Sequence, residues 1–87
     1  MDQEFEQALK DVETLTEKPT NEELLLLYGL YKQVTVGNNT GNKPFAIDIP
    51  RRAKWEAWNQ QINRSKEECQ RDYVNLVNSL IAMYRRP

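Results

Sequence analysis

Residues 21–36 read NEELLLLYGLYKQVTV, and this stretch sets the architecture of the chain. Thr20 precedes it and Glu23 follows three positions later, which is the spacing of a capping box at the start of a helix. The consecutive leucines at 24–27 then place apolar side chains on several sides of that helix. We therefore predict a helix over 21–36 that contacts more than one neighbour and lies centrally.

The segments toward both ends of the chain also show helical periodicity. A helix is predicted over 3–16, because apolar residues recur at the spacing of one buried face until Pro19 stops the pattern. Another is predicted over 66–85, where Ser65 and Glu68 repeat the capping-box spacing. The apolar positions are Phe5, Ala8, Leu9, Val12 and Leu15 in the first of these helices and Cys69, Tyr73, Leu76, Val77, Leu80 and Tyr84 in the second.

Residues 37–49, GNNTGNKPFAIDI, are predicted to form a long loop. Glycine, asparagine and proline are typical of loops, whereas the apolar residues 45–47 argue against disorder. Loops of about 12 residues or more are uncommon in compact domains and tend to be functional. The segment is therefore a candidate rim for a ligand site, with a simple covering loop as the alternative.

A further helix is predicted over 50–61, because Pro50 suits a first helical turn and two tryptophans recur along one face. Large aromatic residues at helical spacing are usually buried, so we place Trp55 and Trp58 in the core. The sequence contains no alternating run of β-branched residues. The expected fold class is therefore all-α, a four-helix up-down bundle in a single domain over 1–87.

The composition disfavours several classes of function. The 87 residues include no histidine and one cysteine, Cys69, so no intramolecular disulfide can form and a cysteine or histidine metal site has no ligands to draw on. Without histidine, the chain also lacks the usual general base of nucleophilic enzymes. No phosphate-loop, dinucleotide-fold or zinc-hydrolase motif occurs in the sequence. We therefore expect a protein that is not an enzyme and that needs neither a metal nor a cofactor.

Neither a membrane span nor a secretory signal is expected. No apolar run approaches the roughly 18 residues that a span requires. The first residues, MDQEFEQALK, are acidic and lack both a basic and an apolar region. A cytoplasmic location is the resulting expectation.

Charge is distributed unevenly along the chain. Residues 1–24 contain eight acids and two bases, whereas residues 25–87 contain five acids and ten bases, although the net charge of the whole chain is −1. Such a separation can focus a positive field at one site of an acidic protein. A small anionic ligand is therefore favoured over a long polyanion, and nucleic-acid binding is not expected.

One cluster of residues is a candidate binding patch. Tyr28, Tyr31 and Lys32 stand at positions i, i+3 and i+4 of the predicted central helix, so they rise from one face within a turn. Lys54 precedes Trp55 and points to the side of the buried stripe of its helix, where its ammonium group can reach a neighbouring groove. The alternative is that the tyrosines are half-buried packing residues and that Lys32 lays its stem along apolar surface.

Two segments carry a resemblance to a known family. YGLYKQVTVG at 28–37 follows an apolar run, and AKWEAW at 53–58 follows a loop that contains proline. Together they resemble the signature of the acyl-CoA-binding protein family, and agreement extends without a gap over at least residues 5–73. The resemblance implies a skewed four-helix bundle that binds long-chain acyl-CoA esters. It also implies an intracellular carrier and pool former that performs no catalysis.

The resemblance further implies which residues contact the ligand. Lys32 and Lys54 fit the 3′-phosphate of CoA, because ammonium groups pair with phosphate by charge-assisted hydrogen bonds. Tyr31 can stack on adenine, Tyr28 can donate a hydroxyl, and Tyr73 can close the pocket. The implied acyl-CoA-binding residues are therefore Tyr28, Tyr31, Lys32, Lys54 and Tyr73. Possible additional phosphate contacts are Arg51 and Arg52, whose guanidinium groups hydrogen-bond phosphate well.

The sequence departs from the family pattern at three places. Glu13 and Pro50 stand where many relatives carry lysine, and Phe45 follows Pro44 where relatives usually have glycine. We therefore expect affinity and chain-length preference to differ from those of closer relatives.

Two other classes of function stay open. One is a helical protein-interaction module or a fragment of a larger acyl-CoA-binding-domain protein, and the more distant one is an enzyme that acts on CoA esters. The leading expectation is a monomer that neither binds nucleic acid nor spans a membrane. It is expected to make transient contact with membranes or with acyl-CoA-using enzymes.

Overall fold

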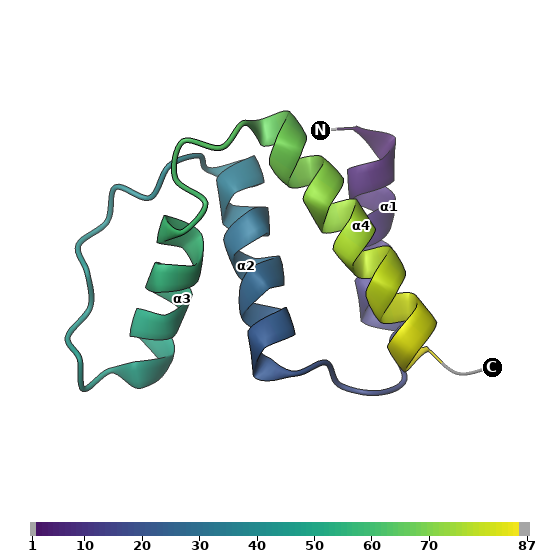
Figure 1. Ribbon diagram of the computed structural model, residues 1–87, viewed down its shortest axis with the longest axis horizontal. Coiled ribbons are helices and arrows are strands. Elements are labelled where there is room, and N and C mark those ends of the chain that lie inside the picture. Colours follow the sequence, from purple (N-terminus) through teal and green to yellow (C-terminus); the bar gives the residue numbers. More distant parts are fainter. Residues whose placement is uncertain (1, 86–87) are drawn as a thin grey trace.

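The computed structural model describes residues 2–85 and consists of four α-helices (Figure 1). They are α1 (Gln3–Asp11), α2 (Asn21–Thr35), α3 (Ile49–Asn59) and α4 (Lys66–Tyr84), and a 3-10 turn, η1 (Val12–Thr14), follows α1. No strand occurs among residues 2–85, which confirms the predicted all-α, four-helix class. Within the described part of the chain, no helix combines the length and the apolar character that crossing a bilayer needs.

The first helix ends earlier than predicted. The hydroxyl of Thr14 donates to the carbonyl oxygen of Asp11 at 2.7 Å, and the backbone tightens there into η1. The backbone N–H of Thr16 then donates to the carbonyl oxygen of Tyr84 at 2.9 Å. The chain leaves the α-helical path to reach the end of α4, so the predicted range 3–16 is wrong after the first nine residues of the helix.

Capping side chains explain where α2 and α4 begin. The backbone N–H of Glu23 donates to the Thr20 hydroxyl at 3.1 Å and the backbone N–H of Thr20 donates to the Glu23 carboxylate at 2.8 Å, which confirms the predicted capping box. At the start of α4, the Ser65 hydroxyl accepts from the backbone N–H of Glu68 at 3.0 Å. The reciprocal bond is missing because the Glu68 carboxylate lies instead 3.4 Å from Arg64.

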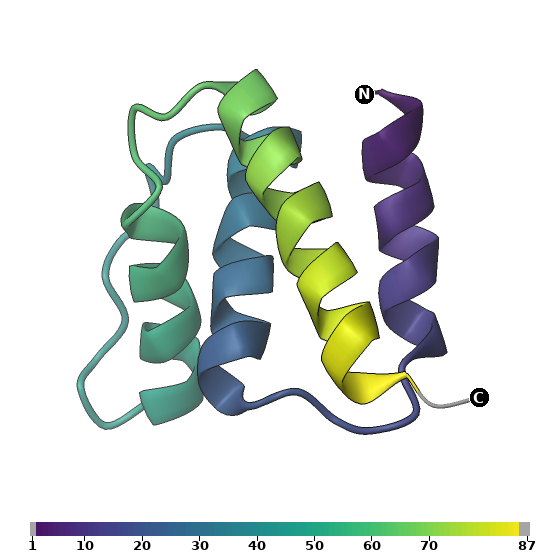
Figure 2. The same ribbon diagram turned by 45° about the vertical axis from the view of Figure 1, so that its right-hand side comes forward.

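The helices lie side by side in the order α1, α4, α2, α3 (Figures 1 and 2). α1 and α4 run in the same direction, because Asp2 donates to Gln70 at 3.1 Å near their starts and Thr16 donates to Tyr84 at 2.9 Å near their ends. α2 and α3 run the opposite way, since the loop between them returns along their length (Figure 1). α2 contacts both α3 and α4, so its predicted central position is confirmed.

The buried core is formed by α1, α2 and α4. Its members are Phe5, Ala8, Leu27, Leu30, Val34, Cys69, Tyr73, Val77 and Leu80. α3 contributes no buried residue to the core, and Trp55 and Trp58 are only half-buried. Their predicted place in the core is therefore wrong. Helical spacing identifies the face of α3 that packs, but it does not reveal how deeply that face is buried.

The tryptophans instead hold the long loop against α3. The indole N–H of Trp58 donates to the carbonyl oxygen of Gly37 at 2.7 Å, and that of Trp55 donates to the carbonyl oxygen of Gly41 at 3.0 Å. The buried side chain of Asn39 donates to the carbonyl oxygen of Trp55 at 3.2 Å. An indole N–H needs a partner when it leaves water, and these loop carbonyls supply it.

A glycine allows α2 and α3 to approach each other closely. Gly29 is buried on α2, and a Cβ atom built on it would lie 2.3 Å from the carbonyl oxygen of Ala57 on α3. No side chain fits at that distance, because the obstacle is backbone. Gly29 thus fixes the spacing of the two helices.

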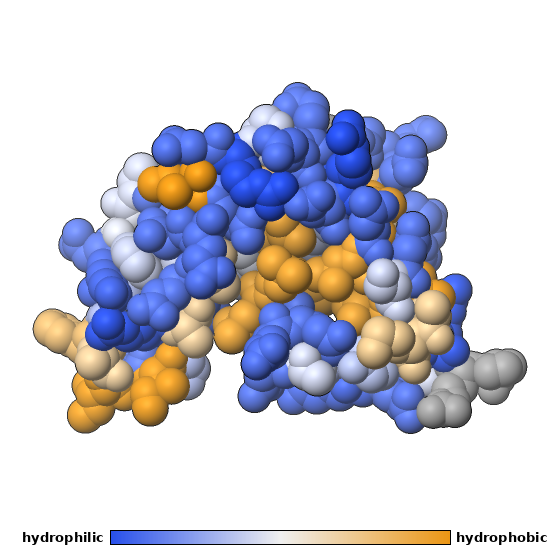
Figure 3. Space-filling model, viewed as in Figure 1, coloured by the Kyte–Doolittle hydropathy of each residue, from blue (hydrophilic) through white to orange (hydrophobic). Residues whose placement is uncertain are grey.

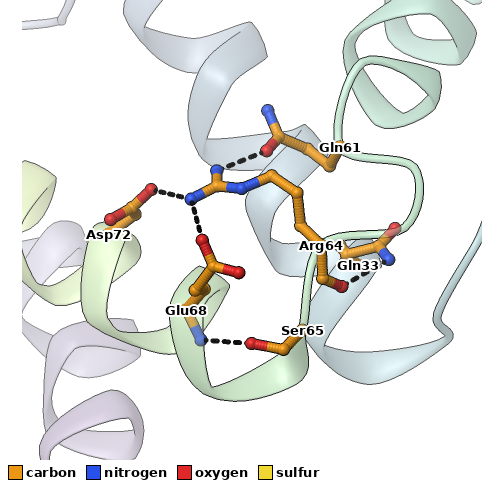
Figure 4. A network of polar contacts seen from close by, with 6 residues as sticks. All are labelled: Gln33, Gln61, Arg64, Ser65, Glu68 and Asp72. Atoms are coloured by element: carbon orange, nitrogen blue, oxygen red, sulfur yellow. Dashed lines mark hydrogen bonds and ion pairs between the residues drawn. The ribbon is translucent and has the colours of Figure 1, made fainter.

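An arginine network ties the turn between α3 and α4 to the rest of the bundle (Figure 4). The guanidinium of Arg64 donates to the Asp72 carboxylate at 2.6 Å and to the side-chain oxygen of Gln61 at 2.8 Å. The hydrogen bond to Asp72 raises the pKa of Arg64 above its ordinary value. The buried amide of Gln33 on α2 donates to the backbone oxygen of Arg64 at 3.1 Å, so the end of α3 is fixed relative to both α2 and α4.

Candidate functional site

An apolar hollow of about 410 Å³ lies between α2 and α3. Apolar side chains form most of its wall, while a tyrosine and a lysine stand among them. The lining residues that matter here are Leu24, Leu25 and Tyr28 on α2 and Ile49, Ala53 and Lys54 on α3. A concave apolar surface with a few polar groups has the chemistry of a small-molecule site.

The cation beside this hollow is Lys54. Its ammonium nitrogen lies 5.7 Å from the centroid of the Tyr28 ring, across the seam between α3 and α2. The side chain is exposed, and within residues 2–85 it forms no ion pair with a carboxylate. The contact with the ring contributes about 0.5–1 kcal/mol at such an exposed site, so Lys54 can turn toward an anionic group at small cost.

A second lysine lies along the same seam. Lys32 stands four residues after Tyr28 on α2, and its ammonium nitrogen lies 4.8 Å from the centroid of the Trp58 ring on α3. It too has no carboxylate partner in the described part of the chain. The structure therefore brings Tyr28, Lys32 and Lys54 together where α2 meets α3.

The other two predicted residues are Tyr31 on α2 and Tyr73 on α4, which lie near each other. Tyr31 is 39% exposed, whereas Tyr73 is 4% exposed and packs edge-on against Phe5 with ring centroids 5.1 Å apart. The pKa of Tyr73 is raised to about 12, mainly by burial and to a smaller extent by nearby Tyr31 and Glu13. Tyr31 is thus partly exposed to solvent, whereas Tyr73 is mainly a core residue.

Arg51 and Arg52 do not join this cluster. The Nε atom of Arg51 lies 3.3 Å from the Asp48 carboxylate, and that of Arg52 lies 3.3 Å from the Glu56 carboxylate. Both arginines are therefore already paired with acids of their own segment. Arg51 also lines a separate hollow of about 340 Å³ beside Phe45, outside the seam that holds the lysines.

Cys69 is a free cysteine that lies in the core, outside the candidate site. Its side chain is fully buried, and burial raises the pKa of the thiol. A protonated thiol without solvent access is a poor nucleophile.

Sequence reasoning identified Tyr28 and Lys54 but not the apolar residues that line the hollow with them. Leu25 and Ala53 line it from opposite helices, and neither was predicted to contact the ligand, although Ala53 begins the AKWEAW segment. The one sequence feature that pointed to the hollow was the leucine run at 24–27. It places apolar side chains on more sides of the helix than the core alone can cover. The role of Gly29 was also missed, because it depends on which helix packs against it.

Comparisons with known proteins agree on one family. The sequence profile of the family described as Acyl CoA binding protein matches residues 2–77. An acyl-CoA-binding protein homolog of Drosophila melanogaster is 43% identical over 82 residues, which cover 94% of this chain and 95% of that protein. An acyl-CoA-binding protein homolog 1 of Caenorhabditis elegans is 48% identical over 80 residues, which cover 92% of this chain and 93% of that protein.

Solved structures give the same result. The crystal structure of Oryza sativa acyl-CoA-binding protein 2 superposes with a TM-score of 0.88 at 42% identity, covering 92% of this chain and 87% of that one. The solution structure of the yeast acyl coenzyme A binding protein gives a TM-score of 0.76 at 44% identity, covering 99% of this chain and 100% of that one. Both the sequence and the fold of this chain are thus shared with acyl-CoA-binding proteins.

Proposed function

Because the chain belongs to the acyl-CoA-binding protein family, we propose that it binds long-chain acyl-CoA esters and carries them without changing them. The observation that carries this proposal is the Tyr28–Lys54 pair at the apolar hollow between α2 and α3. An acyl-CoA has an apolar chain at one end and a phosphorylated nucleotide at the other. The hollow and the adjacent lysines match these two ends.

The acyl chain occupies the hollow between α2 and α3. Leu24, Leu25, Ile49 and Ala53 supply apolar contact there. Each methylene that leaves water contributes about 0.8 kcal/mol, so even partial burial of a long chain is a strong driving force. The thioester then lies against protein at the end of the hollow beside Lys54.

The nucleotide end lies along the seam beyond the hollow. Lys32 and Lys54 hold the 3′-phosphate, because both ammonium groups lack a carboxylate partner within residues 2–85. Tyr31 stacks on adenine with its exposed ring, and the Tyr28 hydroxyl donates to the phosphate. Tyr73 closes the pocket from α4, whereas Arg51 and Arg52 contact phosphate only after they leave their acidic partners.

In this account the protein is a monomeric cytoplasmic carrier that takes part in acyl-CoA transport. It needs no cofactor and performs no catalysis. It exchanges its ligand in transient contacts with membranes or acyl-CoA-using enzymes. A helical protein-interaction module is not favoured, because such a module has no need of an apolar hollow flanked by lysines that form no ion pair within residues 2–85.

A calorimetric titration with palmitoyl-CoA, followed by recovery of the ligand, tests this proposal. We expect saturable binding at one site and no release of free thiol from the recovered thioester. Absence of saturable binding would contradict the carrier role. Release of free thiol would show that the protein is an enzyme instead.

A further inference from the structure

Three large apolar side chains protrude at one end of the molecule. Phe45, Ile47 and Ile49 are 85%, 89% and 72% exposed, and we call them the apolar tip. Figure 3 shows apolar surface gathered there, at the lower left beneath α3. Single exposed apolar residues are ordinary, but a cluster of this kind on a small protein usually marks a contact surface.

The apolar tip is held in a defined position. The backbone N–H of Asp48 donates to the carbonyl oxygen of Phe45 at 3.0 Å, and Ile49 is the first residue of α3. On the N-terminal side, the loop is fixed by the bond from Trp55 to Gly41. The fold thus supports a protruding apolar surface that it does not use in its own core, which is formed by α1, α2 and α4.

Basic residues surround the apolar tip. Residues 43–54 contain four bases, Lys43, Arg51, Arg52 and Lys54, and one acid, Asp48, whereas residues 1–24 are strongly acidic. Arg51 pairs with Asp48 at 3.3 Å and Lys43 pairs with Glu56 at 3.7 Å, both with side chains exposed to solvent. Exposed ion pairs of this kind are weak, so these bases can exchange their partners for other anions.

We propose that the apolar tip docks on an anionic lipid bilayer, with its side chains at the boundary of the acyl region and its bases at the headgroups. Apolar insertion combined with basic flanking residues is the physical basis of reversible binding to such surfaces. A protein partner fits less well, since a stable interface needs about 800 Å² on each side with matching pockets. A small convex tip needs a partner that deforms around it.

Docking would place the proposed acyl-CoA site next to the bilayer. Ile49 belongs to the apolar tip and also lines the hollow between α2 and α3, and Lys54 lines that hollow as well. An acyl chain could then pass between bilayer and hollow with little exposure to water. This functional role rests on the proposed acyl-CoA binding, whereas the docking itself does not.

Co-sedimentation of the ligand-free protein with small vesicles tests the proposal. We expect binding to vesicles of phosphatidylcholine mixed with phosphatidylserine, weaker binding to phosphatidylcholine alone, and weakening by salt. The double variant Phe45→Ser and Ile47→Ser should bind the mixed vesicles at least about tenfold more weakly. The matched control, Val36→Ser and Met83→Ser, removes two apolar side chains that are 61% and 58% exposed elsewhere, and it should bind as the parent does.

Three outcomes would overturn docking through the apolar tip. One is a parent protein that does not bind the mixed vesicles, and another is a control variant that loses binding as much as the tip variant does. The third is a tip variant that binds the mixed vesicles as tightly as the parent does. A parent that binds vesicles but not palmitoyl-CoA would contradict the proposed function while supporting the docking surface.

Discussion

The ammonium nitrogen of Lys54 lies 5.7 Å from the centre of the Tyr28 ring, and this contact joins α3 to α2 beside an apolar hollow. One turn further along α2, Lys32 makes the equivalent contact with Trp58 at 4.8 Å. Each lysine thus rests on an aromatic ring of the opposite helix. In the proposed complex, both ammonium groups turn from these rings to the 3′-phosphate of the ligand.

The first prediction concerns the phosphate role of Lys32. Lys32→Ala should weaken palmitoyl-CoA binding by about 1.5–3 kcal/mol, the range for hydrogen bonds to charged groups. That corresponds to roughly ten- to hundredfold in the dissociation constant measured by calorimetry. The control is the 3′-dephospho form of the same ester, against which the substitution should cost much less. An equal loss against both ligands would show that Lys32 acts on the pyrophosphate or on the fold.

The second prediction concerns the close approach of α2 and α3. Gly29→Ala should destabilise the protein by about 1–3 kcal/mol, the usual cost of overpacking. It should also weaken palmitoyl-CoA binding, because the new Cβ would lie 2.3 Å from the Ala57 carbonyl oxygen and must displace α3. Chemical denaturation and calorimetry measure the two effects. Gly41→Ala is the control, because a Cβ atom on Gly41 would lie 3.4 Å from the nearest other atom, an ordinary contact distance. If the two variants are equally stable, Gly29 does not set the helix spacing.

The third prediction concerns stability at alkaline pH. Tyr73 has a pKa of about 12 in the folded protein against an ordinary value of 10.0. Above pH 10 the unfolded chain releases this proton while the folded chain retains it, so the free energy of unfolding should fall as pH rises from about 10 to about 12. The loss from this group is on the order of 2–3 kcal/mol. In the Tyr73→Phe variant, the free energy of unfolding should fall much less steeply between pH 10 and pH 12. An unchanged slope would show that other groups cause the loss of stability.

The fourth prediction separates the core from the rim of the fold. Phe5 is fully buried, so Phe5→Ala should cost about 3–5 kcal/mol of stability. Trp55→Ala should cost clearly less, because the indole is half-buried and its N–H bonds to a loop carbonyl. Equilibrium denaturation of both variants provides the comparison. Equal destabilisation by the two substitutions would show that Trp55 contributes to stability as a core residue does, as its helical spacing predicted.

Local signals were sufficient to predict where the helices begin. Thr20, Ser65 and Pro50 mark the starts of α2, α4 and α3 to within one residue, because capping and proline geometry depend on neighbouring residues alone. The end of α1 was predicted less well, since its position depends on Tyr84 at the far end of the chain. Sequence spacing cannot reveal a contact of that range.

The candidate site was predicted only in part, because local spacing reveals contacts within one helix but not contacts between helices. Tyr28 and Lys32 share a helical face by their spacing, and the structure keeps them together. That Lys54 faces Tyr28, and that Leu25 and Ala53 form a hollow between them, depends on the parallel packing of α3 on α2. The long loop and the absence of a side chain at Gly29 determine this packing. Neither feature has a sequence pattern that identifies the residues it contacts.

The most direct measurement of the central claim is the calorimetric affinity of the parent protein for CoA, acetyl-CoA and palmitoyl-CoA under the same conditions. Burial of only about four methylenes would contribute about 3 kcal/mol, or more than a hundredfold in affinity. We therefore predict that palmitoyl-CoA binds at least that much more tightly than CoA, with acetyl-CoA close to CoA. Equal affinity for all three ligands would contradict an acyl site between α2 and α3 and would leave only a nucleotide site.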